Sequence, residues 1–476
     1  SAVAGVPVLC APGVEVMLVD SANIEPMIGK LYMEQGAGDE EVLSPAWLRE
    51  VEVSVSCDGS LVASSKGRII TILHVSDDGA DGEPIEVPVE FIRDSDHVTC
   101  LLWITQQAST GSVACLAVGC SDGCLRVFTR DGALVLTQPI HDGAVERMHL
   151  RTLEVAHNTV SDCTEELLLI SENVVARIDG MDLSKLLRSI QSAQASDKPA
   201  TPAASEVRSF RWICEGQTQI SDVICCGTLA TPLFNPEEEG LCFFRFIAAG
   251  AEPSMSLFIG SEEERGPSIA TKLTSSVVSL AKNWFGRTSQ EEEQVAHALS
   301  PTDHPQRLRP ERSFRDQDRR CRYIALDPSG RVAAVTDTLG RVMLVDTNDF
   351  FVVRLWKGYR EAQLAWVEVV PPSEATDPYQ RPRFALVIYA PRRGLLEVWG
   401  VRHAGRLAAL NVGTKCNLLA VPLHLAPPAV AAGASPKKEI VAAAAQQQRR
   451  AGCYLVQAHG TLQRLRVTAA DAPTVG

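Results

Sequence analysis

Short apolar runs separated by polar turns recur along most of this chain, and they predict strands more often than helices. The clearest group contains two Asp-Gly turns and four such runs, at residues 98–104, 113–118, 125–129 and 133–136. Glycine supplies the positive φ that a tight hairpin turn needs, so each Asp-Gly pair predicts a hairpin. Antiparallel sheets built from consecutive strands are therefore expected along most of the sequence.

Similar strands follow turn glycines at wide intervals, as in a repeat protein. Two of these glycines, Gly340 and Gly394, stand 54 residues apart, and the others are Gly67, Gly123 and Gly460. Propeller blades of the WD type usually take roughly 40–45 residues, so these units would carry long loops. We predict an all-β fold, a WD-repeat-like β-propeller of about seven blades over residues 45–470. Residues 1–44 form an N-terminal extension, in which residues 14–19 are expected to complete the last blade and remove an exposed edge.

Three stretches interrupt the strand pattern. Residues 191–206 are polar and rich in Pro, Ala and Ser, and predict a loop. Residues 425–450 are of low complexity and predict disorder. Residues 261–320 combine an amphipathic helix, over residues 268–285, with a basic loop. The loop belongs to an arginine-rich stretch with seven arginines from Arg307 to Arg322.

The helix at residues 268–285 has two interpretations. Its apolar stripe consists of Ile269, Leu273, Val277, Leu280 and Trp284. In the first, the stripe packs against the propeller or a partner. In the second, the stripe lies in a membrane interface, and the opposite face of the helix, which is rich in Ser and Thr, points to solvent. The basic loop is correspondingly either solvated or directed at an acidic partner or anionic lipid.

Composition excludes some classes of protein. A net charge of −13 and a pI of about 5.3 argue against a nucleic-acid-binding body. No apolar run is long enough to span a bilayer, and we expect no signal peptide, although the start at Ser1 suggests a fragment or a processed end. The fourteen cysteines lie mostly in apolar runs without zinc-finger spacing, which predicts buried thiols in a reducing cytosol and no metal.

No catalytic or cofactor-binding motif stands out. Walker, Gly-x-Gly-x-x-Gly, Gly-x-Ser-x-Gly and His-Glu-x-x-His patterns are absent from the sequence. The segment between two predicted strands at 356–363 instead suggests a partner interface through Trp356, Lys357, Tyr359 and Arg360. The alternative is that its aromatic side chains are buried between neighbouring blades.

Several long segments resemble the N-terminal region of the non-catalytic (regulatory) subunit of the Rab-3 GTPase-activating protein complex. The strongest is Arg354-Leu-Trp-Lys-Gly-Tyr-Arg-Glu-Ala-Gln-Leu-Ala-Trp366, followed by residues 333–346, residues 387–399, and Lys272-Leu-Thr-Ser275 leading to Trp284-Phe-Gly286. Weaker similarity extends over most of residues 45–415, whereas the stretch after Leu419 departs from the family.

The resemblance implies a propeller region that a mostly helical remainder would follow. It implies a non-enzymatic subunit of a complex that activates GTP hydrolysis on Rab-3 and promotes nucleotide exchange on Rab-18. The catalytic arginine belongs to the partner subunit in this family, and no arginine here matches that motif. The expected role is that of a scaffold that binds the catalytic subunit and Rab GTPases and helps to target the complex to membranes. The expected location is the cytoplasm and the endoplasmic reticulum, and the expected process is vesicle trafficking. Two alternatives remain: a peripheral membrane platform acting through residues 268–285 without GTPase regulation, and an enzyme with its site in the propeller channel.

Overall fold

The all-β class is confirmed by the computed structural model. It describes residues 7–11, 14–33, 46–76, 82–108, 111–152, 165–195, 207–217, 219–228, 243–261, 305–316, 318–370, 383–401, 405–425 and 451–469. Within these ranges the chain forms thirty strands and three helices, which are α1 (Glu25–Met33), α2 (Trp47–Glu50) and α3 (Gly180–Ala195). None of these helices is long and apolar enough to cross a bilayer.

Most strands pair antiparallel with their neighbours in the sequence, and we number the resulting sheets along the chain. Sheet 1 contains β3 (Glu52–Val55), β4 (Leu61–Lys66), β5 (Ile69–His74) and β6 (Ile85–Pro88). Sheet 2 contains β7 (Val98–Ala108), β8 (Gly111–Cys120), β9 (Cys124–Thr129) and β10 (Leu134–Pro139). Sheet 3 contains β11 (Arg147–Arg151), β12 (Glu166–Ser171), β13 (Val174–Asp179) and β14 (Ser209–Cys214), to which β18 (Gln306–Leu308) adds in parallel.

The remaining strands follow the same plan. Sheet 4 contains β15 (Asp222–Thr228), β16 (Phe243–Ala249), β17 (Met255–Ser261) and β19 (Pro310–Phe314). Sheet 5 contains β20 (Cys321–Leu326), β21 (Val332–Asp337), β22 (Arg341–Asp346) and β23 (Phe351–Lys357).

The last sheet has nine strands, which we treat as two antiparallel halves. Sheet 6 contains β24 (Gln363–Val370), β25 (Arg383–Ala390), β26 (Leu395–Gly400) and β27 (Arg406–Asn411), with β1 (Pro7–Cys10) added to β27. Sheet 7 contains β28 (Cys416–Val421), β29 (Gly452–Gln457), β30 (Thr461–Ala469) and β2 (Val14–Asn23). The halves meet where β24 pairs in parallel with the end of β30.

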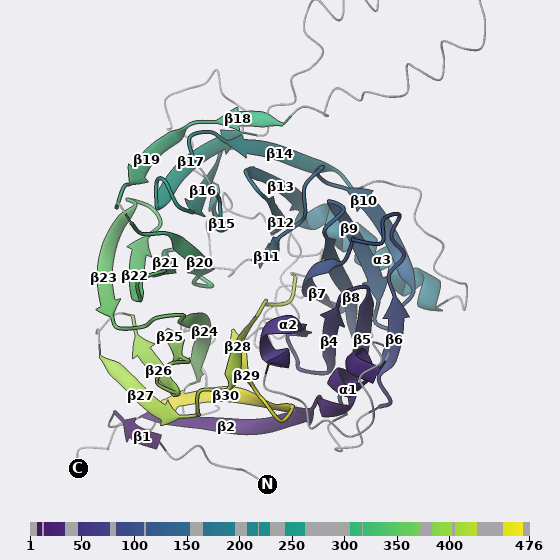
Figure 1. The fold of residues 1–476 in the computed structure, drawn as a ribbon, viewed down its shortest axis with the longest axis horizontal. Helices are drawn as coiled ribbons and strands as arrows, with labels where there is room; N and C mark the ends of the chain where they lie inside the picture. The colour runs from purple at the N-terminus through teal and green to yellow at the C-terminus, as the bar shows by residue number, and fades with distance from the viewer. Residues whose placement is uncertain are drawn as a thin grey trace, which may run out of the picture.

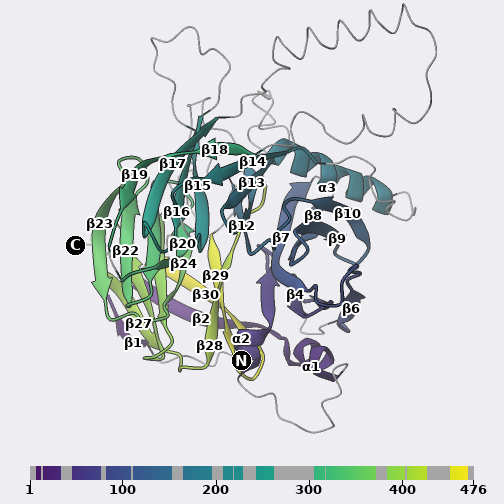
Figure 2. The same ribbon diagram turned by 45° about the horizontal axis from the view of Figure 1, so that its top comes forward.

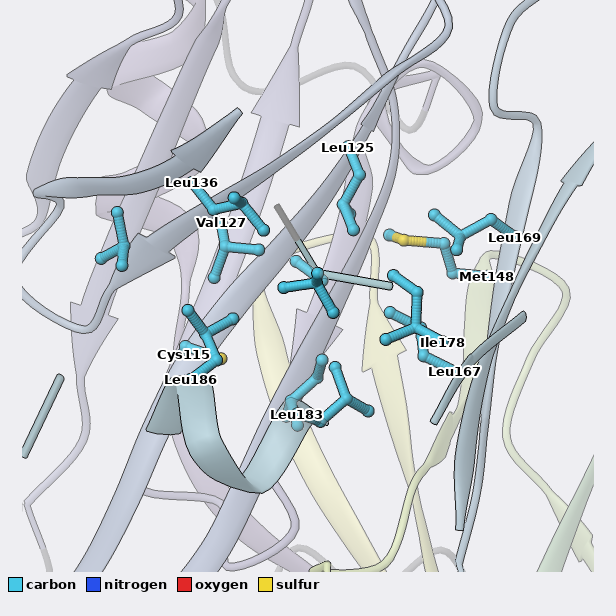
Figure 3. Close-up of a cluster of buried hydrophobic side chains, with 14 of the residues drawn as sticks. Cys115, Leu125, Val127, Leu136, Met148, Leu167, Leu169, Ile178, Leu183 and Leu186 are labelled. Atoms are coloured by element: carbon cyan, nitrogen blue, oxygen red, sulfur yellow. The ribbon is translucent and has the colours of Figure 1, made fainter. Parts of the chain in front are cut away.

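The sheets surround a common centre; strands such as β20 and β24 lie on the inside, and strands such as β23 and β27 lie further out (Figure 1). Each sheet packs on the next through its own cluster of buried apolar side chains. Figure 3 shows the cluster between sheets 2 and 3, where Leu125 and Val127 face Leu167, Leu169 and Ile178. A seventh cluster joins sheet 7 to sheet 1, so the series of packed sheets returns to its start.

Two turns that the sequence marked with glycine have the expected geometry. Gly340 and Gly394 have φ of 86° and 65°, and each precedes the third strand of its sheet. A Cβ at Gly394 would lie 2.8 Å from the backbone carbon of Gly413. A side chain is therefore excluded there by both conformation and space.

The structure differs from the predicted loops at two places. Helix α3 takes in residues 191–195, the first part of the predicted 191–206 loop. It packs Leu183, Leu186, Leu187 and Ile190 into the cluster between sheets 2 and 3 (Figures 2 and 3). Residues 306–308 and 310–314, within the predicted basic loop, are strands β18 and β19. The helix predicted at 268–285 lies outside the described residues, as do residues 426–450.

The N-terminal extension supplies both strands and a helix. Strand β2 pairs antiparallel with β30 from Val14 opposite Ala469 to Asn23 opposite Thr461. Helix α1 follows directly and buries Met27, Ile28 and Leu31 in the cluster between sheets 7 and 1.

Candidate functional site

The two most distinctive segments of the sequence meet between sheets 5 and 6. Trp356, near the end of β23, packs edge-on against Trp399 of β26, with ring centroids 5.7 Å apart. Tyr359, in the turn that follows β23, is buried in the same cluster. We call Arg354, Trp356, Tyr359, Arg393, Glu397, Trp399 and Arg406 the Trp356 cluster.

A buried carboxylate organises this cluster. Glu397 is only 3% exposed and accepts hydrogen bonds from the Tyr359 hydroxyl, from Trp399 Nε1 at 3.3 Å and from Arg406 Nη1 at 2.7 Å. Burial, and then the hydrogen bond to the Glu397 carboxylate, raise the pKa of Tyr359 well above its ordinary value. Glu397 therefore ties the turn after β23 to two strands of sheet 6.

Arginine side chains stack on the aromatic rings of the cluster. The Arg354 guanidinium lies 4.6 Å from the Trp356 ring centroid and 4.8 Å from that of Trp399. Arg393 lies over Tyr359 at 5.4 Å. Guanidinium groups attract aromatic faces and keep donors free for other acceptors.

Two donors in the cluster are buried without an acceptor. These are Arg354 Nη1 and Trp356 Nε1, neither of which has a hydrogen-bond partner among the described residues. A buried donor without an acceptor is costly, so such groups point to a missing partner or to a functional role.

The candidate interface residues separate into two pairs. Trp356 and Tyr359 are each 7% exposed, so their rings lie between the sheets, as the alternative interpretation had it. Lys357 and Arg360 are exposed. The role of these four residues in binding a partner stays a prediction, and the surface that it concerns is carried by Lys357 and Arg360. The candidate helix residues Ile269, Leu273, Val277, Leu280 and Trp284 lie outside the described residues.

Cations dominate the surface around the cluster. Arg392 donates a 2.6 Å hydrogen bond to Glu361, and this bond, with the nearby charges of Arg49 and Arg322, lowers the pKa of Glu361. In the part of the chain that the structure describes, Lys357, Arg360 and Arg393 have no carboxylate within ion-pair distance. The site therefore offers positive charge and hydrogen-bond donors, which suit binding.

Sequence reasoning missed Glu397 and Arg406. The signal for Glu397 is a single carboxylate between apolar residues in Leu395-Leu-Glu-Val-Trp399, which would be costly unless it were paired. No local signal marks Arg406, because its contact with Glu397 depends on the pairing of β26 with β27.

The hydrogen bond from Tyr359 makes a testable contribution to stability. Tyr359→Phe is expected to lower the free energy of unfolding at neutral pH by about 2 kcal/mol, since the acceptor is charged. The pKa of Tyr359 is raised above 10.0, its ordinary value, so this stabilisation is complete below pH 10 and is lost as the pH rises further. The difference between wild type and variant in urea unfolding should therefore shrink at alkaline pH.

Tyr32→Phe is the matched control for this experiment. The Tyr32 hydroxyl donates to Glu50 at 2.8 Å at an exposed site, where loss of the bond should cost well under 1 kcal/mol. Equal losses in the two variants would contradict the assignment of Glu397 as a buried acceptor.

The described residues contain neither a metal-binding cluster nor a disulfide. No group of three His, Cys, Asp or Glu side chains there could hold a metal ion. The twelve cysteines located there carry free thiols, and burial raises the pKa of several, including Cys115 and Cys453, to about 12. The buried thiols with a raised pKa are poor nucleophiles and act as small apolar groups.

Comparison with known proteins identifies the family. The family model for the Rab3 GTPase-activating protein regulatory subunit N-terminus matches residues 47–419, from α2 into β28. A Rab3 GTPase-activating protein regulatory subunit from Caenorhabditis elegans is 29% identical over 193 residues, which are 38% of this chain. The alignment covers 14% of that relative, so the chain spans only a small part of its length. The resemblance noted in the sequence is thus confirmed, and the chain belongs to the family of Rab3 GTPase-activating protein regulatory subunit N-termini.

Proposed function

We propose that this chain is the N-terminal region of a non-catalytic subunit of a Rab3 GTPase-activating complex, in which it acts as a scaffold for the catalytic subunit. The family match over residues 47–419 carries this proposal. Activation of a GTPase commonly uses an arginine that stabilises charge on the transferred phosphoryl group. We assign that arginine to the partner subunit, because no segment here resembles the family's catalytic motif.

We further propose that sheets 1 to 7 are the blades of a seven-bladed β-propeller. Three observations support this: each sheet packs on the next, sheet 7 packs on sheet 1, and all of them surround one centre (Figure 1). The N-terminal β2 is the outermost strand of sheet 7, so that blade combines both ends of the chain. Propellers present wide, rigid surfaces and suit a role in assembly.

We also propose three more specific properties. The complex promotes nucleotide exchange on Rab18, this chain helps to target it to membranes, and it acts at the cytosolic face of the endoplasmic reticulum in vesicle trafficking. Their support is the family resemblance and the amphipathic pattern of residues 268–285. Flotation with liposomes tests the membrane role: Leu273→Asp and Trp284→Ala should reduce flotation of this chain. Equal flotation of wild type and variants would reject that role.

Assembly and rate measurements test the main proposal. The 476-residue chain is expected to co-purify with the catalytic subunit, and its addition should change single-turnover GTP hydrolysis on Rab3. Release of a fluorescent nucleotide from Rab18 is measured in parallel and should become faster. The proposal would be contradicted if the chain neither co-purified with the catalytic subunit nor changed either rate. If it co-purified and changed the rate for one GTPase only, the proposal would be restricted to that GTPase.

A further inference from the structure

The outermost strands of the sheets fall into two groups: those that pair with an additional strand and those that do not. Two outer strands receive an additional strand from elsewhere in the chain: β18 pairs with β14, and β1 pairs with β27. Five outer strands, β2, β6, β10, β19 and β23, pair with one described strand each and leave their other edge open. An open edge presents unpaired backbone donors and acceptors and can accept a foreign strand unless it is blocked.

Four of the five open strands carry residues that discourage pairing. Strands β6 and β10 end at Pro88 and Pro139, and β19 begins at Pro310. Strand β2 exposes the acidic side chains of Glu15 and Asp20. Proline removes a backbone donor and charge opposes association, so these edges are protected.

Strand β23 differs in the sign of its charge. Its charged residues, Arg354 and Lys357, are basic, so they oppose a basic strand but attract an acidic one. Its seven residues, Phe-Val-Val-Arg-Leu-Trp-Lys, include neither proline nor an acidic side chain. It also exposes apolar surface: Phe351 is 49%, Val353 52% and Leu355 36% exposed. With Leu339 in the adjacent turn, these are four of the eight large apolar side chains that are exposed in the described chain. Such clustering marks an interaction surface.

A hollow lies at the end of this strand. It has a volume of about 460 Å³ and is lined by Leu339, Leu355, Gly340, Gly358 and the cations Arg319, Arg341 and Lys357. Arg319 and Arg341 are held by Asp316 and Asp337, which leaves Lys357 as the uncompensated charge of the hollow. The hollow can therefore take an apolar side chain beside a carboxylate.

The charge around β23 is complementary to an acidic ligand. Arg354, Lys357, Arg360 and Arg393 have no carboxylate partner within the described ranges, although the whole chain has a net charge of −13. Of these four residues, Lys357 and Arg360 are exposed, so their charges are accessible to a ligand at this edge. An acidic protein segment supplies carboxylate and carbonyl acceptors together, which a strand of basic or neutral composition does not.

We propose that the open edge of β23 is the docking site for an extended, acidic segment of a partner protein. The segment adds to sheet 5 as a fifth strand, as β1 and β18 do on sheets 6 and 3. Backbone hydrogen bonds supply affinity, an apolar side chain enters the hollow between Leu339 and Leu355, and carboxylates contact Lys357 and Arg360. This inference rests on the edge itself and holds whether or not the chain regulates Rab GTPases.

Binding of designed peptides to the 476-residue chain tests the inference. The probe is a fluorescein-labelled peptide that alternates glutamate with valine, measured by fluorescence anisotropy. One comparison peptide replaces glutamate by lysine, and another is N-methylated at alternate residues, which removes the backbone donors of one edge. The acidic peptide is expected to bind, and both comparison peptides are expected to bind at least about tenfold more weakly.

Protein variants locate the site. Lys357→Glu/Arg360→Glu and Leu355→Asp are each expected to weaken binding about tenfold or more. The matched control is Arg130→Glu/Lys185→Glu, which reverses two exposed charges, one in the turn between β9 and β10 and one in α3, and should leave binding unchanged. Circular dichroism and thermal unfolding establish that each variant is folded.

Four results would overturn the inference. Equal binding of the N-methylated peptide would show charge attraction without strand pairing. Equal weakening in the site and control variants would place the peptide elsewhere. Flotation on phosphatidylserine vesicles that depends on Lys357 and Arg360, without peptide binding, would identify a membrane surface. Failure of all peptides to bind the folded wild type would reject the docking strand itself.

Discussion

Glu166→Ala is expected to lower the free energy of unfolding by about 3–5 kcal/mol, the usual effect of removing one partner from a buried ion pair. Glu166 and Arg177 are both fully buried, and Arg177 Nε donates a hydrogen bond to Glu166 Oε2. Arg151 Nη1 lies 3.7 Å from Glu166 Oε1, and Asp179 Oδ2 lies 3.3 Å from Arg177 Nη2. The positive charges of two arginines are thus neutralised by the negative charges of two carboxylates between sheets 3 and 4.

The position of Arg177 explains the size of the effect. Its guanidinium lies 4.2 Å from the ring centroid of Phe244 in sheet 4, so it cannot turn toward water without disturbing the packing of the sheets. Alanine at 166 removes one negative charge and leaves an excess positive charge in a low-dielectric interior. Because domains are stable by only about 5–15 kcal/mol, a loss of this size removes a large part of the total.

Urea unfolding of three variants separates charge from packing. Glu166→Leu/Arg177→Met removes the pair together and should recover much of the loss, since apolar replacements of buried pairs are often neutral or stabilising. The control is Glu215→Ala, which breaks ion pairs with the exposed Arg307 and Arg309 and should cost less than about 1 kcal/mol. A double variant that is less stable than Glu166→Ala would contradict the electrostatic explanation.

Asp222→Ala is expected to cost about 3 kcal/mol, because one buried carboxylate joins three sheets through charge-assisted hydrogen bonds. Asp222 is fully buried at the start of β15. His149 Nε2 in sheet 3 donates to its Oδ1 at 2.6 Å, and the backbone N–H of Ile324 in sheet 5 donates to its Oδ2 at 2.7 Å. Alanine would leave the Ile324 donor buried without this acceptor.

Asp222→Asn tests whether charge or shape matters at this junction. Asparagine can still accept from Ile324, so it should be more stable than the alanine variant and less stable than wild type. Asp131→Ala, at an exposed turn, is the control and should change stability by at most about 0.5 kcal/mol. Burial, and to a smaller extent the charge of Asp222, raise the pKa of Tyr323 to about 12. That pKa should fall in both Asp222 variants, and an unchanged value would contradict this electrostatic effect of Asp222 on Tyr323.

The strands were predictable because their signal is local. Alternation of apolar and polar residues and the Asp-Gly turns sufficed for β8, β9 and β10. Helix α3 was missed, although Leu183, Leu186, Leu187 and Ile190 have helical spacing, because the composition of the next segment suggested a loop. Strand β18 is three residues long and pairs in parallel with β14 across a wide gap in the sequence, so no local pattern specifies it.

The candidate site was predictable only in part. Trp356 and Tyr359 were found by their aromatic and basic neighbours, but whether they face solvent depends on how sheet 6 packs on sheet 5. The contacts of Glu397 with Tyr359 and Arg406 likewise arise from residues on different strands. The open edge of β23 could not be predicted either, because β1 and β18 cover the outer strands of two sheets, whereas no described strand covers β23.

The pairing of β2 with β30 has a consequence for synthesis on the ribosome. Val14 to Asn23 are synthesised more than 400 residues before their partners, Thr461 to Ala469. At about 5–20 residues per second, β2 waits roughly 20–90 s for its partner. During that time the apolar side chains of Val16 and Leu18, buried in the finished protein, have no sheet to cover them. A chaperone that binds nascent chains would find a target in this strand.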